Sequence, residues 1–224
     1  MNKKVLVVVA HPDDEVLGAG ATIFQHSISG DTVKVICLTE GASAQGNDIQ
    51  KREESFTKAC QTLGVNDYSI LSFHDNKLDQ YPLLELIQSI ESATLNFAPQ
   101  IIYTHSSNDL NIDHRIAHQA VITAFRPLPL SSVEKILTFN IPSSFEYRSS
   151  HITTLKPNFY NEINEQECKQ KLLAMSCYET ELKDYPHPRS HRHLRNLMEV
   201  NGVEVGLPLA ESFYIERIIE SKKT

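Results

Sequence analysis

The 224-residue chain has no tryptophan, only four cysteines and no excess of basic residues. The cysteines do not form a Cys-x-x-Cys pair, and their scatter is typical of reduced thiols rather than of a disulfide framework. We therefore expect a cytoplasmic protein in which they are small apolar core residues without a metal role. The four positions are Cys37, Cys60, Cys168 and Cys177.

Basic stripes and long apolar runs are also missing. The formal net charge is -7, which argues against nucleic acid as a partner. A membrane-spanning helix needs about 20 apolar residues, and no segment approaches that length. The short apolar run after Lys3 and Lys4 lacks the length and the cleavage site of a signal peptide. We expect no membrane span.

Strand-like and helix-like segments alternate along the first half of the chain. This alternation predicts an α/β fold, a Rossmann-like open and mostly parallel sheet flanked by helices, with a C-terminal elaboration. The length favours a single domain over residues 1–224. Strands are predicted at 4–10, 33–39, 68–71, 100–104, 135–140 and 213–219, and helices at 15–29, 49–63, 83–97, 113–125, 165–177 and 189–200.

The most informative segment is an apolar run, Val5 to Ala10, that ends in His-Pro-Asp-Asp-Glu at residues 11–15. Six apolar residues suit a strand that is buried on both faces. The polar cluster then lies at the carboxyl end of that strand, which is where open α/β sheets bind their ligands. One imidazole and three carboxylates crowded there indicate a metal site.

A second polar cluster lies in the same kind of place. The strand predicted at 100–104 is followed by His105, and the next helix opens with Asp113 and His114. Catalytic zinc sites use three protein ligands from His, Asp or Glu and keep an open position. His11, one of the two adjacent aspartates, and His114 would supply such a set.

The motif at residues 11–15 closely resembles the signature of the PIG-L / LmbE-like zinc deacetylases, which hydrolyse N-acetyl groups of N-acetylglucosamine-type sugars. The resemblance also covers 104–115, 185–190, and Val-Gly at 205–206 followed by Ala-Glu at 210–211. It implies that His11, Asp14 and His114 are the metal ligands. The metal implied is zinc, although iron(II) suits the same donors.

The resemblance further makes Asp13 the general base that accepts a proton from the metal-activated water. One position departs from the family pattern, because Asn111 stands where the well-known sugar deacetylases have a histidine. An amide can donate a hydrogen bond to an oxyanion but cannot deliver a proton. Either Asp13 shuttles the proton alone or another group serves, with His187 and then His105 as candidates.

Five other residues are candidates for the site, and most have a structural interpretation as well. Asp113 either caps its helix or bonds into the active site. By resemblance Arg52 and Asp75 contact the sugar, whereas the structural alternative for Arg52 is a surface ion pair with Glu53 or a neighbour. His187 and Arg189, bracketed by prolines, form either a wall of the substrate cleft or a rigid surface turn.

The sequence thus predicts a metal-dependent hydrolase that releases acetate from an acetamido sugar, which a nucleotide or lipid carries. The alternatives are an amidase acting on a non-sugar or thiol conjugate, and a non-catalytic carbohydrate-binding protein with a degenerate site. A Rossmann oxidoreductase is disfavoured, because Gly18 and Gly20 do not form the Gly-x-Gly-x-x-Gly fingerprint and suit close helix–sheet packing instead. A homo-oligomer is compatible with the sequence.

Overall fold

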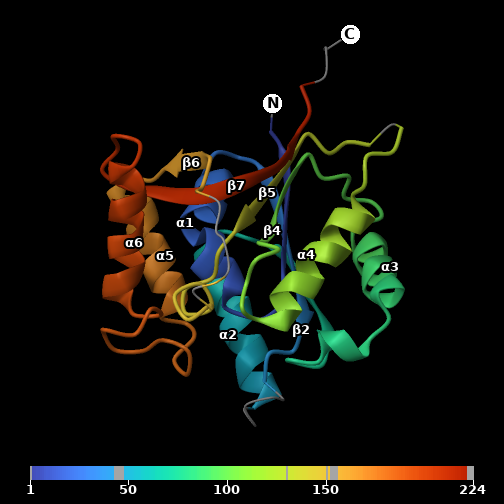
Figure 1. Ribbon diagram of the computed structural model, residues 1–224, viewed down its shortest axis with the longest axis horizontal. Helices are drawn as coiled ribbons and strands as arrows, with labels where there is room; N and C mark the ends of the chain where they lie inside the picture. Colours follow the sequence, from blue (N-terminus) through green and yellow to red (C-terminus); the bar gives the residue numbers. More distant parts are fainter. Residues whose placement is uncertain (1, 43–47, 130, 150, 152–155, 221–224) are drawn as a thin grey trace.

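A seven-stranded sheet forms the centre of the protein, shown as a computed structural model in Figure 1. The structure describes residues 2–42, 48–129, 131–149, 151 and 156–220. The strand order is β3-β2-β1-β4-β5-β7-β6, and the first five strands are parallel. The strands are β1 (Lys4–Val9), β2 (Thr32–Thr39), β3 (Asp67–Phe73), β4 (Ile101–His105), β5 (Lys135–Phe139), β6 (Phe159–Glu162) and β7 (Ala210–Ile218).

Strand β1 is central and is buried on both of its faces, as its continuous apolar sequence predicts. Val5, Val7 and Val9 pack into one core cluster, and the alternate residues of the strand pack into another. The chain runs from β1 outward to β2 and β3, and then returns to β4 on the other side of β1. The carboxyl ends of β1 and β4 therefore flank the point where the strand order reverses, which is the usual ligand site of such sheets.

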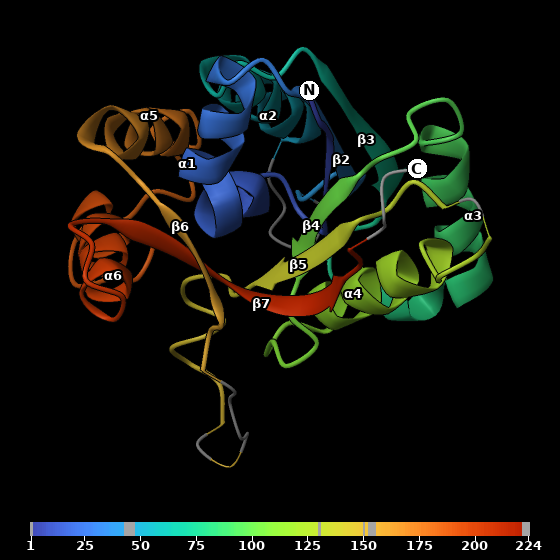
Figure 2. The same cartoon turned by 90° about the horizontal axis from the view of Figure 1, so that it is seen from above.

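Helices cover both faces of the sheet, as Figure 2 shows. On one face lie α1 (Asp14–Ile28), α2 (Ile49–Thr62) and α5 (Glu165–Met175). On the other lie α3 (Leu83–Ala93) and α4 (Ile112–Ala124). A short 3-10 helix, η1 (Leu78–Gln80), precedes α3. The predicted α/β, Rossmann-like fold is confirmed.

The C-terminal elaboration extends the same sheet with two antiparallel strands. Strand β7 pairs with β5, and β6 pairs with β7 at the edge. Helices α5 and α6 (His191–Val203) lie beside β7, on the opposite side of the molecule from α3 and α4 (Figure 1). The sequence did not predict β6, because four edge residues, Phe-Tyr-Asn-Glu, give too short a pattern.

Side-chain caps explain where several helices begin and end. Asn164 caps α5 in a capping box with Glu167, as its sequence indicates. Helix α6 starts two residues later than predicted, because the Ser190 hydroxyl accepts the N–H of His193. Helix α3 ends at Ala93 rather than at 97, and the hydroxyl of Thr94 bonds back to the carbonyl of Ile90.

Gly18 confirms close packing of α1 on the sheet. A Cβ atom at Gly18 would lie only 2.3 Å from the ring of Phe139 in β5. Gly20 instead faces α5, where a Cβ would lie 3.1 Å from Cγ of Lys171. Among the described residues, none of the helices has the length and apolar character needed to cross a membrane.

Candidate metal centre

The turn from β1 into α1 is wound so that its polar groups face one another. The backbone N–H of His11 donates to Asp14 Oδ2 at 2.8 Å, and the N–H of Asp14 donates to the carbonyl of His11 at 3.2 Å. Between them Asp13 has a φ of 118°, a conformation that few side chains other than Asp and Asn tolerate. This strained turn separates the two carboxylates, so that Asp13 and Asp14 point to different partners.

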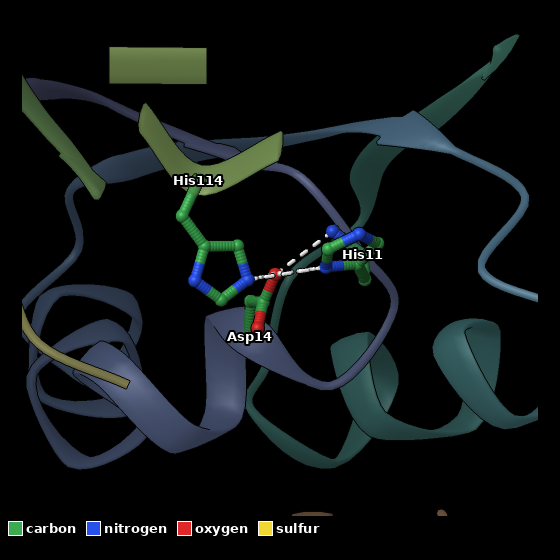
Figure 3. Close-up of side chains that lie close together, drawn as sticks. All are labelled: His11, Asp14 and His114. Atoms are coloured by element: carbon green, nitrogen blue, oxygen red, sulfur yellow. Dashed lines mark hydrogen bonds and ion pairs between the residues drawn. The ribbon is translucent and has the colours of Figure 1, made fainter. Parts of the chain in front are cut away.

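Three buried donor atoms form a nearly equilateral triangle, shown in Figure 3. Nδ1 of His11 lies 3.2 Å from Oδ2 of Asp14 and 3.1 Å from Nε2 of His114. Nε2 of His114 lies 3.4 Å from the same Asp14 oxygen. Ligand atoms about 2.0–2.1 Å from a tetrahedral zinc are about 3.3 Å apart, so the triangle fits a small divalent cation with an open fourth position.

Carboxylates behind the two imidazoles orient them. Nε2 of His11 lies 3.2 Å from Asp113 Oδ2 and 3.2 Å from Asp75 Oδ1. Nδ1 of His114 lies 3.0 Å from Asp109 Oδ1. Such carboxylate–histidine pairs are typical of metal sites, because they fix the nitrogen that faces the metal.

His105 packs against one of the proposed ligands. Its ring stacks on that of His114, with the ring centroids 4.1 Å apart. Its Nε2 accepts the backbone N–H of Ala10 at 2.8 Å, which fixes that nitrogen as unprotonated. Burial, and then the neighbouring His114, hold the pKa of His105 well below its usual range. The His105 ring is therefore uncharged and packs against His114.

The proposed ligand residues shift one another's pKa values because opposite charges lie in contact. Burial lowers the pKa of His11, but hydrogen bonds to Asp113 and Asp14 outweigh it and raise the pKa to about 10. Burial also lowers the pKa of His114, but the charge of Asp14 and the hydrogen bond to Asp109 outweigh this effect and raise the pKa to about 9. Burial alone would raise the pKa of Asp14, yet the imidazoles hold it well below the usual range. A divalent cation would replace the protons that this cluster shares.

A second cluster surrounds Asp13. Its Oδ2 lies 3.1 Å from Nη1 of Arg189 and 3.4 Å from Nη2 of Arg52. Glu181 bridges the two arginines, at 2.9 Å from Arg52 and 2.6 Å from Arg189. Burial raises the pKa of Asp13 to about 6 against the opposing charges of Arg189 and Arg52. Asp13 is therefore largely ionised at neutral pH.

Glu15 belongs to the interior of the fold. It is fully buried, its Oε1 accepts from the hydroxyl of Tyr178 at 2.5 Å, and its Oε2 accepts the N–H of Asp13 at 3.1 Å. Burial raises the pKa of Glu15 to about 8, although the Tyr178 hydrogen bond opposes this shift. Glu15 therefore fixes the backbone of the strained residue Asp13 and is not one of the proposed metal ligands.

The arrangement matches a known group of proteins. The PIG-L family model, described as GlcNAc-PI de-N-acetylase, matches residues 6–125, which is more than half of the chain. The chain belongs to the PIG-L family. The matched segment contains the three proposed ligands and ends before α5, so the elaboration that carries Glu181 and Arg189 lies outside it.

Relatives and solved structures agree with this assignment. An uncharacterized deacetylase of Escherichia coli is 28% identical over 77% of this chain and 89% of its own length. The diacetylchitobiose deacetylase of Thermococcus kodakarensis is 27% identical, over 93% of this chain and 81% of its own. The crystal structure of the N,N'-diacetylchitobiose deacetylase of Pyrococcus horikoshii has a TM-score of 0.77 at 23% identity, and the match covers 95% of this chain and 83% of that chain.

The fold alone does not fix the reaction. The hydratase GalB from Pseudomonas putida has a TM-score of 0.74 with this PIG-L protein at 18% identity, covering 99% of each chain. The chemistry must therefore be argued from the side chains of the site.

The structure places the other predicted residues as follows. Arg52 is buried and contacts Asp13 and Glu181, so the alternative of a surface pair with Glu53 is wrong. Asn111 caps α4, where its Oδ1 accepts the N–H of Asp113 at 2.8 Å, while its Nδ2 lies 3.4 Å from Asn76. Its predicted contact with an oxyanion stays a prediction.

Asp113 and His187 have well-defined neighbours. Oδ1 of Asp113 accepts the N–H of Leu78 at 3.1 Å, and its other oxygen faces His11. His187 is half-buried, and its Nδ1 accepts the N–H of Arg189 at 3.0 Å. Burial and the adjacent arginine lower the pKa of His187. The catalytic roles of both residues stay predictions.

Glu181 is a site residue that the sequence did not reveal. It follows α5 in a turn-rich segment, and one of its two partners, Arg52, lies more than a hundred positions away, so no local spacing marks it. A buried acid in such a turn becomes meaningful only once the fold has brought Arg52 and Arg189 together.

We expect zinc to bind with a stoichiometry of one per chain and His114→Ala to abolish this binding, because two donors alone hold zinc weakly. Equilibrium dialysis followed by elemental analysis measures the bound metal. His151→Ala, which removes an exposed histidine, is the matched control and should bind zinc as the wild type does. Equal zinc content in His114→Ala and the control would contradict the ligand assignment.

The zinc affinity should rise with pH. Without metal, the neighbouring carboxylates raise the pKa values of His11 and His114 above neutrality, and Nδ1 of His11 lies 3.1 Å from Nε2 of His114, so at least one of these facing nitrogens carries a proton at neutral pH. Metal binding must release at least this proton. The apparent Kd should therefore fall about ten-fold or more per pH unit between about pH 6 and about pH 8. Competition with a chromogenic chelator tests this, and a pH-independent Kd would refute it.

Proposed function

We propose that this protein hydrolyses the acetamide of an N-acetylated sugar or sugar conjugate and releases acetate and a free amine. The observation that carries the proposal is the buried triangle of His11, Asp14 and His114 donor atoms. Asp13, the residue before Asp14, adds a buried carboxylate that two arginines hold. The similarity to the Thermococcus deacetylase, which spans most of both chains, supports the acetamido sugar as the substrate class.

His11, Asp14 and His114 would hold the metal, and we propose zinc. When bound, zinc supplies Lewis acidity that polarises the amide carbonyl and acidifies water. The donor set of two nitrogens and one carboxylate oxygen suits zinc and also iron(II), since ligand type alone does not select between them in a cell.

Asp13 moves the proton in this proposal. Its carboxylate accepts a proton from the attacking water and returns it to the nitrogen of the leaving amine. Other proton donors are less well placed, because His105 is buried behind His114 and Nδ1 of His187 bonds to the backbone of Arg189. The two arginines fix the direction of the Asp13 carboxylate.

The family resemblance supports a set of substrate contacts. We propose that Arg52, Arg189 and Asp75 bind sugar hydroxyls, and that His187 lies in the wall of the cleft. The Nδ2 group of Asn111 is a donor for the oxyanion. A nucleotide or lipid carrier of the sugar, a homo-oligomer and a cytoplasmic location also belong to this proposal, and the scattered cysteines support the last of these.

The first test is acetate release from a panel of acetamido sugars, free and linked to nucleotide or lipid. We expect acetate from at least one of them in the zinc-loaded protein, and loss of that activity with a chelator. Mass spectrometry identifies the product by the loss of one acetyl group. Exclusive turnover of non-sugar or thiol-linked amides would favour the amidase alternative, and sugar binding without turnover would favour a carbohydrate-binding protein.

Asp13→Asn should lower kcat by about 10²–10⁴-fold while zinc stays bound, because the amide cannot accept the proton. Asn also tolerates the positive φ of this position. The control is Asp67→Asn, an exposed residue that starts β3 and pairs with Lys34, and it should keep wild-type kcat. A kcat near wild type in Asp13→Asn would remove Asp13 from the mechanism.

A further inference from the structure

Helix α1 is broken one turn after the metal centre. Ala19 has φ −146° and ψ 20°, which are not helical values, although helix continues on both sides. Gly18 precedes the break and lies against Phe139. The short first segment, residues 14–18, therefore has a direction of its own, and it carries the ligand Asp14.

A buried ion pair from two distant elements occupies this break. Nζ of Lys171, in α5, donates to the carbonyl of Leu17 at 3.0 Å. Glu211, in β7, accepts the N–H groups of Ala21 at 3.2 Å and Thr22 at 2.7 Å. The two charged groups lie 2.5 Å apart, and both side chains are almost fully buried. Three backbone groups around the break thus have a charged partner.

The positions of these contacts are informative. In a regular helix the carbonyl of Leu17 and the N–H of Ala21 would bond to each other, since they are four residues apart. Lys171 binds the first and Glu211 binds the second, which is a recognised way to kink a helix. The positive charge lies at the C-terminal end of the first segment and the negative charge at the N-terminal end of the second, as the helix dipoles favour.

Stability does not explain this pair. Buried ion pairs are often no more stabilising than apolar residues of the same size, because both charges lose their water. Gly20 leaves room for the stem of Lys171, so the surroundings are fitted to it. Glu211 belongs to the Ala-Glu pair at 210–211, which the proposed metal chemistry does not use.

We propose that Lys171 and Glu211 are positioning residues for the metal centre. They keep α1 kinked at Ala19 and thereby set where the Asp14 carboxylate meets the two imidazoles. This inference rests on the metal centre of the proposed function. It gives the C-terminal elaboration a role in building a site whose proposed ligands all lie between residues 11 and 114.

The test uses Lys171→Met/Glu211→Leu, a double variant without buried charge that should fold. Its Leu17 carbonyl and Ala21 N–H are free to bond to each other, which would straighten α1 and shift Asp14. We expect the zinc Kd to rise about ten-fold or more, and the visible absorption of the cobalt(II) form to change. The control is Arg195→Met/Glu165→Leu, which removes an exposed pair between α6 and α5.

The outcomes separate the two proposals. Weaker zinc binding and an altered cobalt spectrum in the double variant, with wild-type values in the control, support the inference. A folded double variant with the wild-type Kd and spectrum overturns it and leaves the metal centre standing. A wild-type protein that binds no zinc overturns both. If the double variant does not fold, Glu211→Gln, which keeps the shape of the side chain, is measured in the same way.

Discussion

The parallel pairing of β1 with β4 determines where the proposed metal ligands lie. Val5, Leu6 and Val7 are in register with Ile101, Ile102 and Tyr103, so both strands end at the same edge of the sheet. His11 follows the end of β1, and His114 lies in the first turn of α4, the helix that follows β4. A shift of one residue in this register would turn the buried side chains of β1 to the opposite face and separate the ligands.

Buried charged side chains gather at this edge of the sheet, and the fold pairs them with opposite charges from other elements. Asp14 lies between two imidazoles, each of which has a carboxylate on its far side. The neighbouring carboxylate Asp13 faces two arginines that Glu181 holds together. Unpaired buried charges would be costly, so each group depends on a partner from another element. The result is a preorganised site whose polar atoms need little rearrangement when a cation enters.

The sequence predicted the parts of this design that have a local pattern. The apolar run of β1 and the polar residues after it identified the site, and the alternation of elements predicted the sheet. Family resemblance, rather than spacing, divided the roles of Asp13 and Asp14. Edge strand β6 escaped prediction because it has only four residues. Glu181 and Lys171 were not predicted because a buried charge is recognised by its partners, and Arg52 and Leu17 lie more than a hundred positions away from them in the sequence.

The backbone at Asp13 has an evolutionary consequence. Its left-handed conformation admits asparagine nearly as readily as aspartate, so the proposed proton acceptor can be lost without a rearrangement of the turn. With the roles proposed above, one substitution would leave the metal ligands and the arginines in place and remove only the reaction. A fold of this kind can therefore give rise to non-catalytic sugar receptors in a single step, and in a newly found relative residue 13 is the first position to inspect.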